Sequence, residues 1–577
     1  MKRAPAVVLS LFSLLTLLLL GQAPAQAPSG AYERYAVASD HALASQAGAE
    51  LLAAGGNAAD AAAATMLALG VVSPGSSGLG GGGFALYYDA SDGTVTFLDF
   101  RERAPGAATA DMFGGQGAGE GPASRPSQLG GRATGVPGEP AGIDELVRRF
   151  GSKPLSEITA PAARYAEQGF EVTEYIAGLS MPFGPQMRRD PVMRRWFEGE
   201  AEALRPGQTV RMPELAATLR ELGRRGSAPF YRGRIAREIV AANRRNGGIM
   251  AMADLRDYRV VEREPLEARR MGFRWVTAPA PSAGGYTMLA SLGLLDRWIP
   301  AARRGEATGE LMHAFAESWK GPFWDRASYF GDPDQVDVPI GRLLDDARIA
   351  RRAARFRPTL AVPVDWYALP LAREDRPAQQ PDNAGTSHLC VVDAEGNVAS
   401  ITTTVNLPFG ARYTAAGMVM NDEMDDFASE VGEQNAFGLP GGAANLPAPG
   451  KRPVSTMTPT IVFDEAGRPV LCVGAAGGSR IVTATEQVAW HALVRGLEPN
   501  EALAHPRVHH QGVPDTLRVE TERPLDAATI AALRARGHTI EEVGHSAIVQ
   551  LIRIRPEGSP RLVAVSDPRK GGRPAGE

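Results

Sequence analysis

In the first half of the chain, apolar residues recur mainly at the spacing of helices. Two alanine-rich segments, 42–55 and 57–69, predict consecutive helices. Asn57 is expected to cap the second helix, with Asp60 in its first turn, because acceptor oxygens there satisfy the free amides of a helix start. Farther along, residues 143–354 predict mostly amphipathic helices, among them 214–225, 234–245 and 311–323.

After residue 385 the pattern changes to the two-residue period that is typical of strands. Near the end, a strand, a helix and a pair of strands are expected in turn over 517–520, 526–536, 547–555 and 561–565. A helix-rich first portion with a strand-rich second portion predicts a layered α/β structure that shares one core. At 577 residues the chain is long enough for two lobes or two domains.

Three segments rich in glycine or proline interrupt this pattern. Residues 78–83 contain G-x-G-x-x-G, but no strand precedes them and a strand, not a helix, follows. A dinucleotide site needs the opposite order, so we interpret these glycines as sites of close backbone packing. Residues 114–142 predict a long surface loop, and residues 358–385 predict an exposed linker.

Composition narrows the class of protein without defining it. The chain is 44% hydrophobic and 22% charged with a formal charge of −4, which is ordinary for a globular protein. No basic patch indicates binding to nucleic acid. We expect no cofactor and no metal.

The N-terminus carries the pattern of a secretory signal over residues 1–27. Lys2 and Arg3 precede an apolar run over 6–20, and small residues follow at Ala25 and Ala27, near which cleavage is expected. The alternative is an uncleaved membrane anchor, although the run is shorter than the roughly 20 residues of a span. A signal predicts a periplasmic or secreted protein.

The only two cysteines, Cys390 and Cys472, each lie inside an apolar strand-like run. We expect them to be small buried hydrophobic residues. A disulfide is the alternative that an exported protein would allow.

A threonine opens the strand-rich portion directly after the linker. If the bond between Gly385 and Thr386 breaks, Thr386 carries both a hydroxyl nucleophile and a free α-amine that can act as its base. A turn signal centred on Glu395, with Gly396 in the left-handed position, predicts a hairpin. In that register Thr386 lies opposite Thr404, so that two hydroxyls meet across the ladder.

The same register divides the hairpin into two faces. One face is expected to be wet or reactive, and it carries Thr386, His388, Cys390, Thr402 and Thr404. The other is expected to be packed, and it carries Leu389, Val391, Ala399 and Ile401.

Three further groups of residues carry candidate chemistry. Asn406 follows Thr404, and residues 421–427 place four acids beside apolar side chains. This acidic segment lacks the spacing and glycine of a calcium-binding EF-hand, so we interpret it as an anionic pocket for a substrate ammonium. Hydroxyls cluster at 455–460, and the glycines at 474–478 offer unobstructed amides of the kind that form an oxyanion hole.

Together these motifs closely resemble the γ-glutamyltranspeptidase family of N-terminal nucleophile hydrolases. The resemblance covers nearly all of the chain after the signal and includes 55–61, 78–84, 100–105, 386–388, 404–406, 421–427, 451–460, 477–480 and 566–569. It implies an αββα sandwich that is made as a proenzyme and cuts itself. A large subunit, 28–385, and a small subunit, 386–577, would then remain together as a heterodimer.

The resemblance also implies a role for each matched residue. Thr386 would be the nucleophile, oriented by Thr404, and the γ-glutamyl group of glutathione or a related compound would pass through it to water, an amino acid or a dipeptide. The amides of Gly477 and Gly478 would stabilise the oxyanion. The substrate α-carboxylate would bind to Arg101, Ser455 and Thr456, and the α-ammonium to Asn406, Glu423 and Asp426. In the segment that resembles the family's lid, Phe437 stands where bacterial members often have tyrosine, which implies a looser lid.

Two other functions fit parts of the same pattern. A glutaryl-cephalosporin acylase would use this scaffold for substrates without an α-ammonium, and the presence of Asn406, Glu423 and Asp426 argues against it. An inactive exported binding protein would need neither Thr386 nor Thr404, so their presence argues against that reading.

Overall fold

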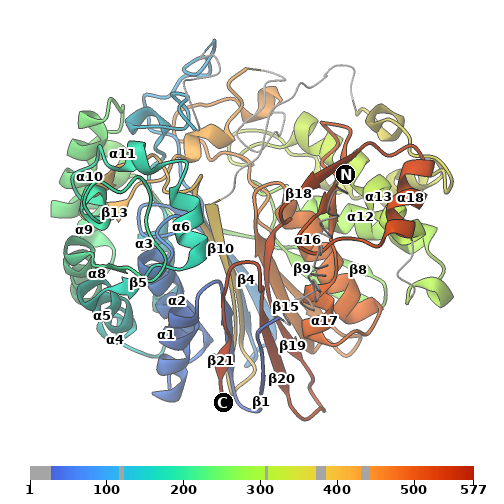
Figure 1. Ribbon diagram of the computed structural model, residues 1–577, viewed down its shortest axis with the longest axis horizontal. Coiled ribbons are helices and arrows are strands. Elements are labelled where there is room, and N and C mark those ends of the chain that lie inside the picture. The colour runs from blue at the N-terminus through green and yellow to red at the C-terminus, as the bar shows by residue number, and fades with distance from the viewer. Residues whose placement is uncertain (1–26, 116–122, 306–308, 372–384, 431–441) are drawn as a thin grey trace, which may run out of the picture.

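The computed structural model describes residues 27–115, 123–305, 309–371, 385–430 and 442–577. Most of the predicted signal, residues 372–384 of the linker and Phe437 lie outside these residues. Two seven-stranded sheets face each other, and helices cover the outer face of each sheet (Figure 1). The predicted αββα sandwich is confirmed. No helix in the described ranges combines the length and the apolar character that a membrane span needs.

The first sheet has the candidate nucleophile on a central strand. Its order is β21 (Ala575–Gly576), β2 (Ala36–Ser39), β10 (Gly385–Val392), β11 (Val398–Asn406), β3 (Gly82–Asp89), β4 (Thr94–Phe100) and β7 (Val261–Arg263). Its outer face packs on α1 (Ala42–Ala53) and α2 (Ala58–Val72). The predicted cap of α2 is confirmed, because Asn57 and Asp60 form a reciprocal capping box.

The second sheet supplies the opposite wall of the core. Its order is β1 (Ser29–Tyr32), β20 (Leu562–Ser566), β19 (Ile548–Ile554), β15 (Pro469–Ala476), β14 (Thr460–Phe463), β9 (Phe273–Thr277) and β8 (Leu266–Arg270). Its outer face is covered by α12 (Gly284–Trp298), α13 (Gly309–Tyr329) and α16 (Arg480–Ala489). Both sheets mix strands from before and after residue 385, so the two portions share one core.

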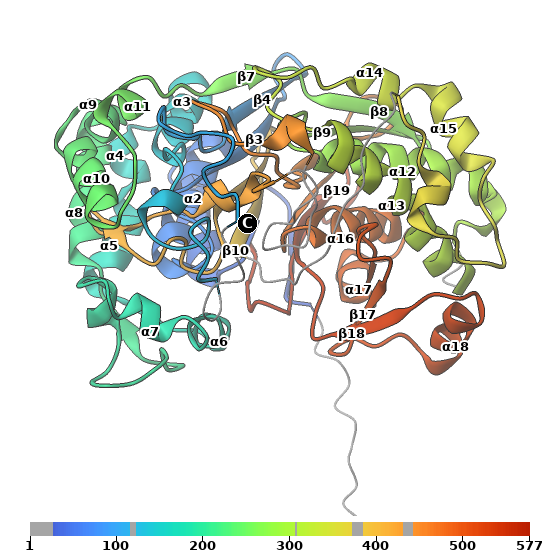
Figure 2. The same cartoon turned by 90° about the horizontal axis from the view of Figure 1, so that it is seen from above.

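The remaining helices flank the sandwich on opposite sides (Figure 2). One group holds α3 (Glu139–Phe150), α4 (Leu155–Ile158), α5 (Ala160–Gln168), α6 (Glu174–Ser180), α8 (Pro213–Arg225), α9 (Ala228–Arg232), α10 (Arg234–Arg245) and α11 (Met252–Arg256). Beside the second sheet lies a small sheet of β16 (Val508–His509), β17 (Leu517–Glu520) and β18 (Ile540–Val543). In the chain, α17 (Pro499–Ala504) precedes β16, and α18 (Ala527–Ala535) connects β17 to β18. The predicted α8, α10, α13, β17, α18, β19 and β20 are confirmed within a few residues.

The middle of the chain is mostly helical, as predicted, although the short strands β7, β8 and β9 cross it. Strands of three to five residues are too short to display a clear period. In the strand-rich portion α16 was missed, although Arg480, Thr483 and Gln487 recur at helical spacing in it. The segment 114–142 was predicted to lie on the surface, yet residues from Gly131 to Pro140 are largely buried beneath the site.

The hairpin of β10 and β11 has the predicted register. Thr386 pairs with Thr404 and His388 with Thr402, and Gly396 has a φ of 93°. The prediction that the threonine face is wet was wrong, because that face packs against the second sheet. There the ring of His388 occupies the space beside Gly474, where a Cβ would approach it to 2.3 Å.

The two cysteines also meet between the sheets. Cys390 on β10 and Cys472 on β15 form a disulfide with a Cα–Cα distance of 5.9 Å, so the expectation of free cysteines was wrong. The sequence could not pair them, because the contact depends on how the two sheets stack.

The glycine-rich segment before β3 packs backbone on backbone, as predicted. A Cβ on Gly80 would lie 2.0 Å from the carbonyl oxygen of Val419, and one on Gly81 would lie 2.0 Å from that of Thr404. These contacts leave no room for a side chain and hold the end of β11 against the neighbouring loop.

One buried acid lies between the helices that cover the second sheet, and it is expected to make the stability of the fold depend on pH. Glu486 accepts hydrogen bonds from Ser291 and Trp319, and burial raises its pKa to about 8. The folded protein therefore holds a proton that the unfolded chain releases near pH 4.5. Its contribution to stability is full below that pH and is lost as the pH rises to about 8.

Replacing this acid by an uncharged amide removes that loss. Denaturant unfolding of Glu486→Gln from pH 5 to 8 is expected to show a free energy of unfolding that falls less steeply than in the wild type, by up to about 1.4 kcal/mol per pH unit. The exposed substitution Glu542→Gln serves as the control and should keep the wild-type slope. Equal slopes in all three proteins would show that Glu486 is ionised in the folded state.

Candidate active site

The backbone is irregular where Gly385 joins Thr386. The register of β10 against β11 shifts between these two residues, so the ladder contains a bulge that redirects the threonine. Asn406, opposite the bulge, has a φ of 75°, which is uncommon for a residue other than glycine. A Cβ on Gly385 would lie 2.7 Å from the carbonyl oxygen of Gly75, so only glycine fits before Thr386.

Two hydroxyls converge on the carbonyl of Gly385. The hydroxyl oxygens of Thr386 and Thr404 each lie 2.8 Å from that carbonyl oxygen and 3.1 Å from each other. The amide of Asn406 donates to the Thr404 hydroxyl at 2.9 Å, which leaves the Thr404 proton directed at the carbonyl. Thr404 can therefore polarise the bond that Thr386 would attack.

A lysine near the C-terminus holds the other side of the nucleophile, and the sequence did not identify it as a site residue. Lys570 is buried and donates to the carbonyl oxygen of Thr386 at 3.1 Å, to Asp40 at 2.7 Å and to Ser76 at 3.0 Å. These contacts tie the start of β10 to three distant parts of the chain. Lys570 directly follows the motif at 566–569 that the family resemblance covers. This position in the sequence was the one indication that Lys570 could belong to the site.

A small charged pocket opens on the inner side of Thr386. Its volume is about 20 Å³, close to that of one water molecule, and it contains Thr386, Thr404, Arg101, Asn406, Glu423, Asp426, Ser455, Thr456 and Gly478. All the residues predicted to bind substrate or catalyse therefore line it, except Gly477. They come from β4, β10, β11 and the loops at 421–427, 454–457 and 477–480.

Arg101 is paired with both acids that the sequence assigned to the ammonium. Its guanidinium is almost fully buried, with one nitrogen bonded to Glu423 and the other 2.5 Å from Asp426. Its position is fixed from behind, because the backbone carbonyl of Arg101 accepts from Tyr258 at 2.9 Å and its amide donates to Asp99. A ligand with one carboxylate and one ammonium could replace these internal pairs with pairs of its own.

The tertiary structure separates the four acids of the 421–427 segment into two roles. Glu423 and Asp426 face the pocket. Asp422 instead accepts from the amide of Leu407 at 2.9 Å, and Asp425 accepts from Ser127 at 2.6 Å. The second pair supports the loop from behind and does not line the pocket.

The polar groups around these acids are also oriented. The side-chain amide of Asn406 donates to the carbonyl oxygen of Asp422 at 3.0 Å, so its own oxygen is the acceptor left for an ammonium. Ser455 accepts from the amide of Met457 at 3.1 Å and retains a hydroxyl proton for a carboxylate. Thr456 donates to the carbonyl oxygen of Gly478 at 2.9 Å, so in this state it supports the glycine turn.

Two charged residues of this region were missed by the sequence. Arg326, buried on α13, lines the pocket, and its pKa is lowered to about 10 by burial against the opposing attraction of Asp426. Glu102 lies beside Glu423, and burial raises its pKa to about 8; burial also raises the pKa of Glu423 against the pull of Arg101. Burial thus disfavours the charged form of both carboxyl groups.

The glycines predicted for the oxyanion hole form the turn before α16. Gly477 and Gly478 have φ values of 144° and 57°, and a Cβ on Gly477 would collide with Ala547 at 2.8 Å. Their carbonyls accept from the amides of Arg480 and Ile481, so the turn leads directly into the helix. The helix start places a partial positive charge at this position.

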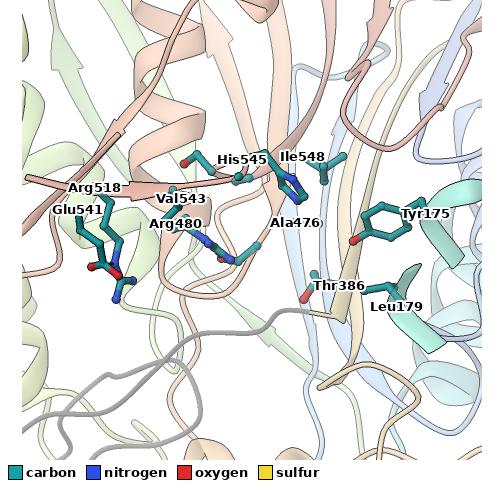
Figure 3. A pocket seen from close by; sticks show the side chains of 14 residues that line it. Tyr175, Leu179, Thr386, Ala476, Arg480, Arg518, Glu541, Val543, His545 and Ile548 are labelled. Carbon is teal, nitrogen blue, oxygen red and sulfur yellow. Dashed lines mark hydrogen bonds and ion pairs between the residues drawn. The ribbon is translucent and has the colours of Figure 1, made fainter. Parts of the chain in front are cut away.

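A second, larger cavity meets Thr386 from the outer side (Figure 3). It has a volume of about 450 Å³, and Gly477, Tyr175, Arg480, Arg518 and His545 contribute to its wall. Arg518 is paired with Glu541 at 3.0 Å, whereas the side chain of Arg480 extends across the middle of the cavity. Thr386 thus lies at the junction of a small charged pocket and a roomy polar one.

The histidine beside the nucleophile is structural. His388 lies between the sheets, 2.8 Å from the hydroxyl of Thr402, and burial lowers its pKa to about 3. A neutral ring in that position holds the two strands together and has no path to the Gly385 carbonyl through the described contacts.

The fold is a four-layer αββα sandwich, and Thr386 follows a glycine that no larger residue can replace at the start of a central strand. Together these features define an N-terminal nucleophile hydrolase. The family model described as gamma-glutamyltranspeptidase matches residues 44–577. The chain belongs to the γ-glutamyltranspeptidase family.

Individual relatives agree with this placement. The chain is 38% identical over 568 residues to a glutathione hydrolase proenzyme of Pseudomonas aeruginosa, covering 96% of this chain and 97% of the relative. It is 36% identical over 539 residues to that of Escherichia coli, covering 92% and 90%. A crystal structure of a cephalosporin acylase from Bacillus halodurans superposes with a TM-score of 0.82 at 27% identity, covering 96% of this chain and 98% of that one.

Proposed function

We propose that this protein is a self-processing γ-glutamyl hydrolase and transferase that acts on glutathione and related γ-glutamyl compounds. The observation that carries the proposal is the position of the Thr386 hydroxyl at the mouth of a pocket in which the buried guanidinium of Arg101 pairs with the carboxyl groups of Glu423 and Asp426. An amino-acid head group has the complementary charges. The named relatives are glutathione hydrolase proenzymes, which supports the choice of donor.

The pocket geometry supports recognition of the glutamyl α-carbon substituents. Arg101 and the Ser455 hydroxyl would take the α-carboxylate, and Asn406, Glu423 and Asp426 the α-ammonium. The pocket holds only about 20 Å³, so binding must displace the internal ion pairs of Arg101. A donor that lacks either charge would leave a buried charged group unpaired, which costs several kcal/mol.

Self-processing and turnover would both be acyl transfers to the Thr386 oxygen. In the precursor, the Thr386 hydroxyl attacks the carbonyl carbon of Gly385, the bond to the Thr386 nitrogen breaks, and water hydrolyses the resulting ester. The freed α-amine then takes the hydroxyl proton as Thr386 attacks the γ-carbonyl of a donor, and it passes that proton to the leaving amine. Water or an acceptor amine would next attack the γ-glutamyl ester, giving up a proton through the α-amine and releasing the product and the Thr386 hydroxyl, while the Gly477 and Gly478 amides would stabilise each oxyanion.

The outer cavity is the proposed position of the leaving group and of the acceptor. At about 450 Å³ it accommodates a dipeptide, an amino acid or water next to Thr386. The guanidinium of Arg480 would attract the carboxylate of a peptide leaving group. Breakage of the Gly385–Thr386 bond would give subunits 28–385 and 386–577, which stay together because both contribute strands to each sheet.

Export is part of the same proposal. The charged, apolar and small-residue pattern of residues 1–27 supports a signal that directs the protein to the periplasm or out of the cell. The disulfide between Cys390 and Cys472 is consistent with an oxidising compartment.

The decisive experiment compares two chromogenic donors that differ only in the α-ammonium. Purified processed protein is assayed with γ-glutamyl-p-nitroanilide and with glutaryl-p-nitroanilide, with and without a dipeptide acceptor. We expect kcat/KM to favour the γ-glutamyl donor by at least about 100-fold, because the glutaryl group leaves Glu423 and Asp426 without a partner.

A preference for the glutaryl donor would instead support the acylase, which the similarity to the Bacillus halodurans structure keeps as the second candidate. Turnover of neither donor by processed protein would support the binding protein. An increase in rate with the dipeptide would assign transfer as well as hydrolysis.

A further inference from the structure

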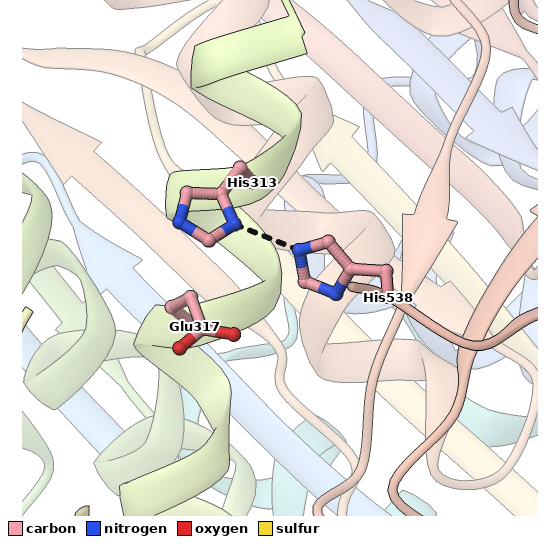
Figure 4. A group of neighbouring side chains, drawn as sticks. All are labelled: His313, Glu317 and His538. Atoms are coloured by element: carbon pink, nitrogen blue, oxygen red, sulfur yellow. Dashed lines mark hydrogen bonds between the residues drawn. The ribbon is translucent and has the colours of Figure 1, made fainter. Parts of the chain in front are cut away.

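A group of metal-binding side chains lies apart from the active site. His313 and Glu317 are four residues apart on α13, so they share one face of the helix. His538 reaches the same point from the turn after α18, where Gly537 has a φ of 93° (Figure 4). The potential ligand atoms of the three residues all lie within 4.8 Å of one another.

The two imidazoles are buried and held in an orientation suited to ligation. The Nε2 of His313 lies 2.8 Å from the backbone carbonyl oxygen of Arg357, which can only accept. His313 is therefore protonated at Nε2, and its Nδ1 accepts a hydrogen bond from the Nε2 of His538 at 2.7 Å, so that an ion bound here would take the place of the shared proton. A histidine that donates its other nitrogen to a backbone carbonyl is the usual arrangement around a bound metal.

The carboxylate has a competing partner that can be shared. Glu317 lies 2.8 Å from Lys320, which in turn lies 3.3 Å from Asp515 and donates to the carbonyl oxygen of Val362 at 2.6 Å. Lys320 therefore keeps two partners if Glu317 rotates toward an ion. The carboxylates of Glu317 and Asp515 and the ammonium of Lys320 together carry a net charge of −1. A bound divalent cation would change this charge to +1.

We propose that His313, Glu317 and His538 form a binding site for a divalent transition-metal ion of the zinc type. Two imidazole nitrogens and one carboxylate oxygen suit Zn²⁺ and leave a fourth position open. His313 also borders a cavity of about 320 Å³ whose wall includes Trp298 and Phe356, and this cavity would give access to the ion and to a water ligand.

The site has a structural role that is separate from catalysis. Arg326, which lines the glutamyl pocket, lies 13 residues farther along α13, or about 20 Å at the helical rise of 1.5 Å per residue. The ion would connect α13 to the turn after α18, which belong to different subunits if the proposed cleavage occurs. Metal binding itself does not require that cleavage, so the site can be tested whether or not the proposed function is correct.

The test measures metal binding directly. Untagged protein is stripped with a chelator and titrated with Zn²⁺ alone by calorimetry, and with Co²⁺ alone by visible absorption. We expect one equivalent to bind, the melting temperature to rise, and the Co²⁺ complex to show the d–d bands of tetrahedral nitrogen and oxygen ligation. Loss of one of three ligands in His538→Gln should weaken binding by at least about 100-fold.

A substitution elsewhere controls for the loss of a histidine side chain. His505 is half-buried, packs against His491 with ring centroids 4.1 Å apart and lies outside the cluster, so His505→Gln should bind Zn²⁺ like the wild type. If His538→Gln does not fold, Glu317→Gln replaces it in the comparison. The proposal is overturned if the stripped wild type binds no stoichiometric Zn²⁺, or if binding is equally tight after either cluster residue is substituted.

Discussion

The variant Thr386→Ala is expected to remain a single uncut chain and to lose γ-glutamyl transfer. Its side chain cannot attack the Gly385 carbonyl, although Thr404 still lies 2.8 Å from the carbonyl oxygen and polarises it. Without cleavage there is neither a nucleophile nor a free α-amine, so kcat should fall by roughly 10⁶-fold, the order found when a covalent nucleophile is removed. Intact mass of the denatured protein and initial rates with a γ-glutamyl anilide measure both effects.

Two further variants separate chemistry from folding. Thr386→Ser keeps the hydroxyl and should be cut, whereas Thr404→Val keeps the shape but removes the group that polarises the Gly385 carbonyl, so it should be cut more slowly. Because Thr386 is buried in a sheet that forms in the precursor, the melting temperature of Thr386→Ala should stay near that of an uncut wild-type chain. Two fragments from Thr386→Ala would place the cleavage site elsewhere and contradict the assignment.

Replacing Arg101 by glutamine is expected to abolish most recognition of the donor without preventing cleavage. The change removes the anchor for the α-carboxylate and leaves Glu423 and Asp426 without their shared cation. Loss of one partner from a buried charged group costs about 3 to 5 kcal/mol, so kcat/KM for a γ-glutamyl donor should fall by about 10³-fold. Steady-state kinetics of the processed variant provide the measurement.

The controls address charge and stability. Arg101→Lys retains the charge but loses the planar fork, so its kcat/KM should lie between those of the wild type and Arg101→Gln. Arg263 pairs with Asp99 at 2.8 Å and with Asp334 at 2.9 Å but does not line the pocket, so Arg263→Gln should lower stability and leave KM unchanged. Wild-type kinetics in Arg101→Gln would show that Arg101 does not bind the donor. If the Arg101→Gln chain is not cleaved, the variant is misfolded.

The sequence alone determined the local structure around the nucleophile. A turn at Glu395 fixes which residues of the hairpin face each other, since a slip of one residue would move every side chain to the opposite face of the sheet; the pairing of Thr386 with Thr404 follows. Asn57 and Asp60 likewise define a helix start, because a cap depends only on neighbouring residues. The ordered motifs indicated the family, and the residues that they nominated gather around one pocket.

Only the tertiary structure decided which of several equivalent residues face that pocket. Four acids within 421–427 look alike in sequence, yet Asp422 and Asp425 are engaged from behind, while Glu423 and Asp426 meet Arg101. The burial of the threonine face and the disulfide likewise arise from the stacking of two sheets. Arg326, Lys570 and His538 contact residues that are far from them in the sequence. No local sequence pattern encodes such contacts, because they are set by the packing of whole elements.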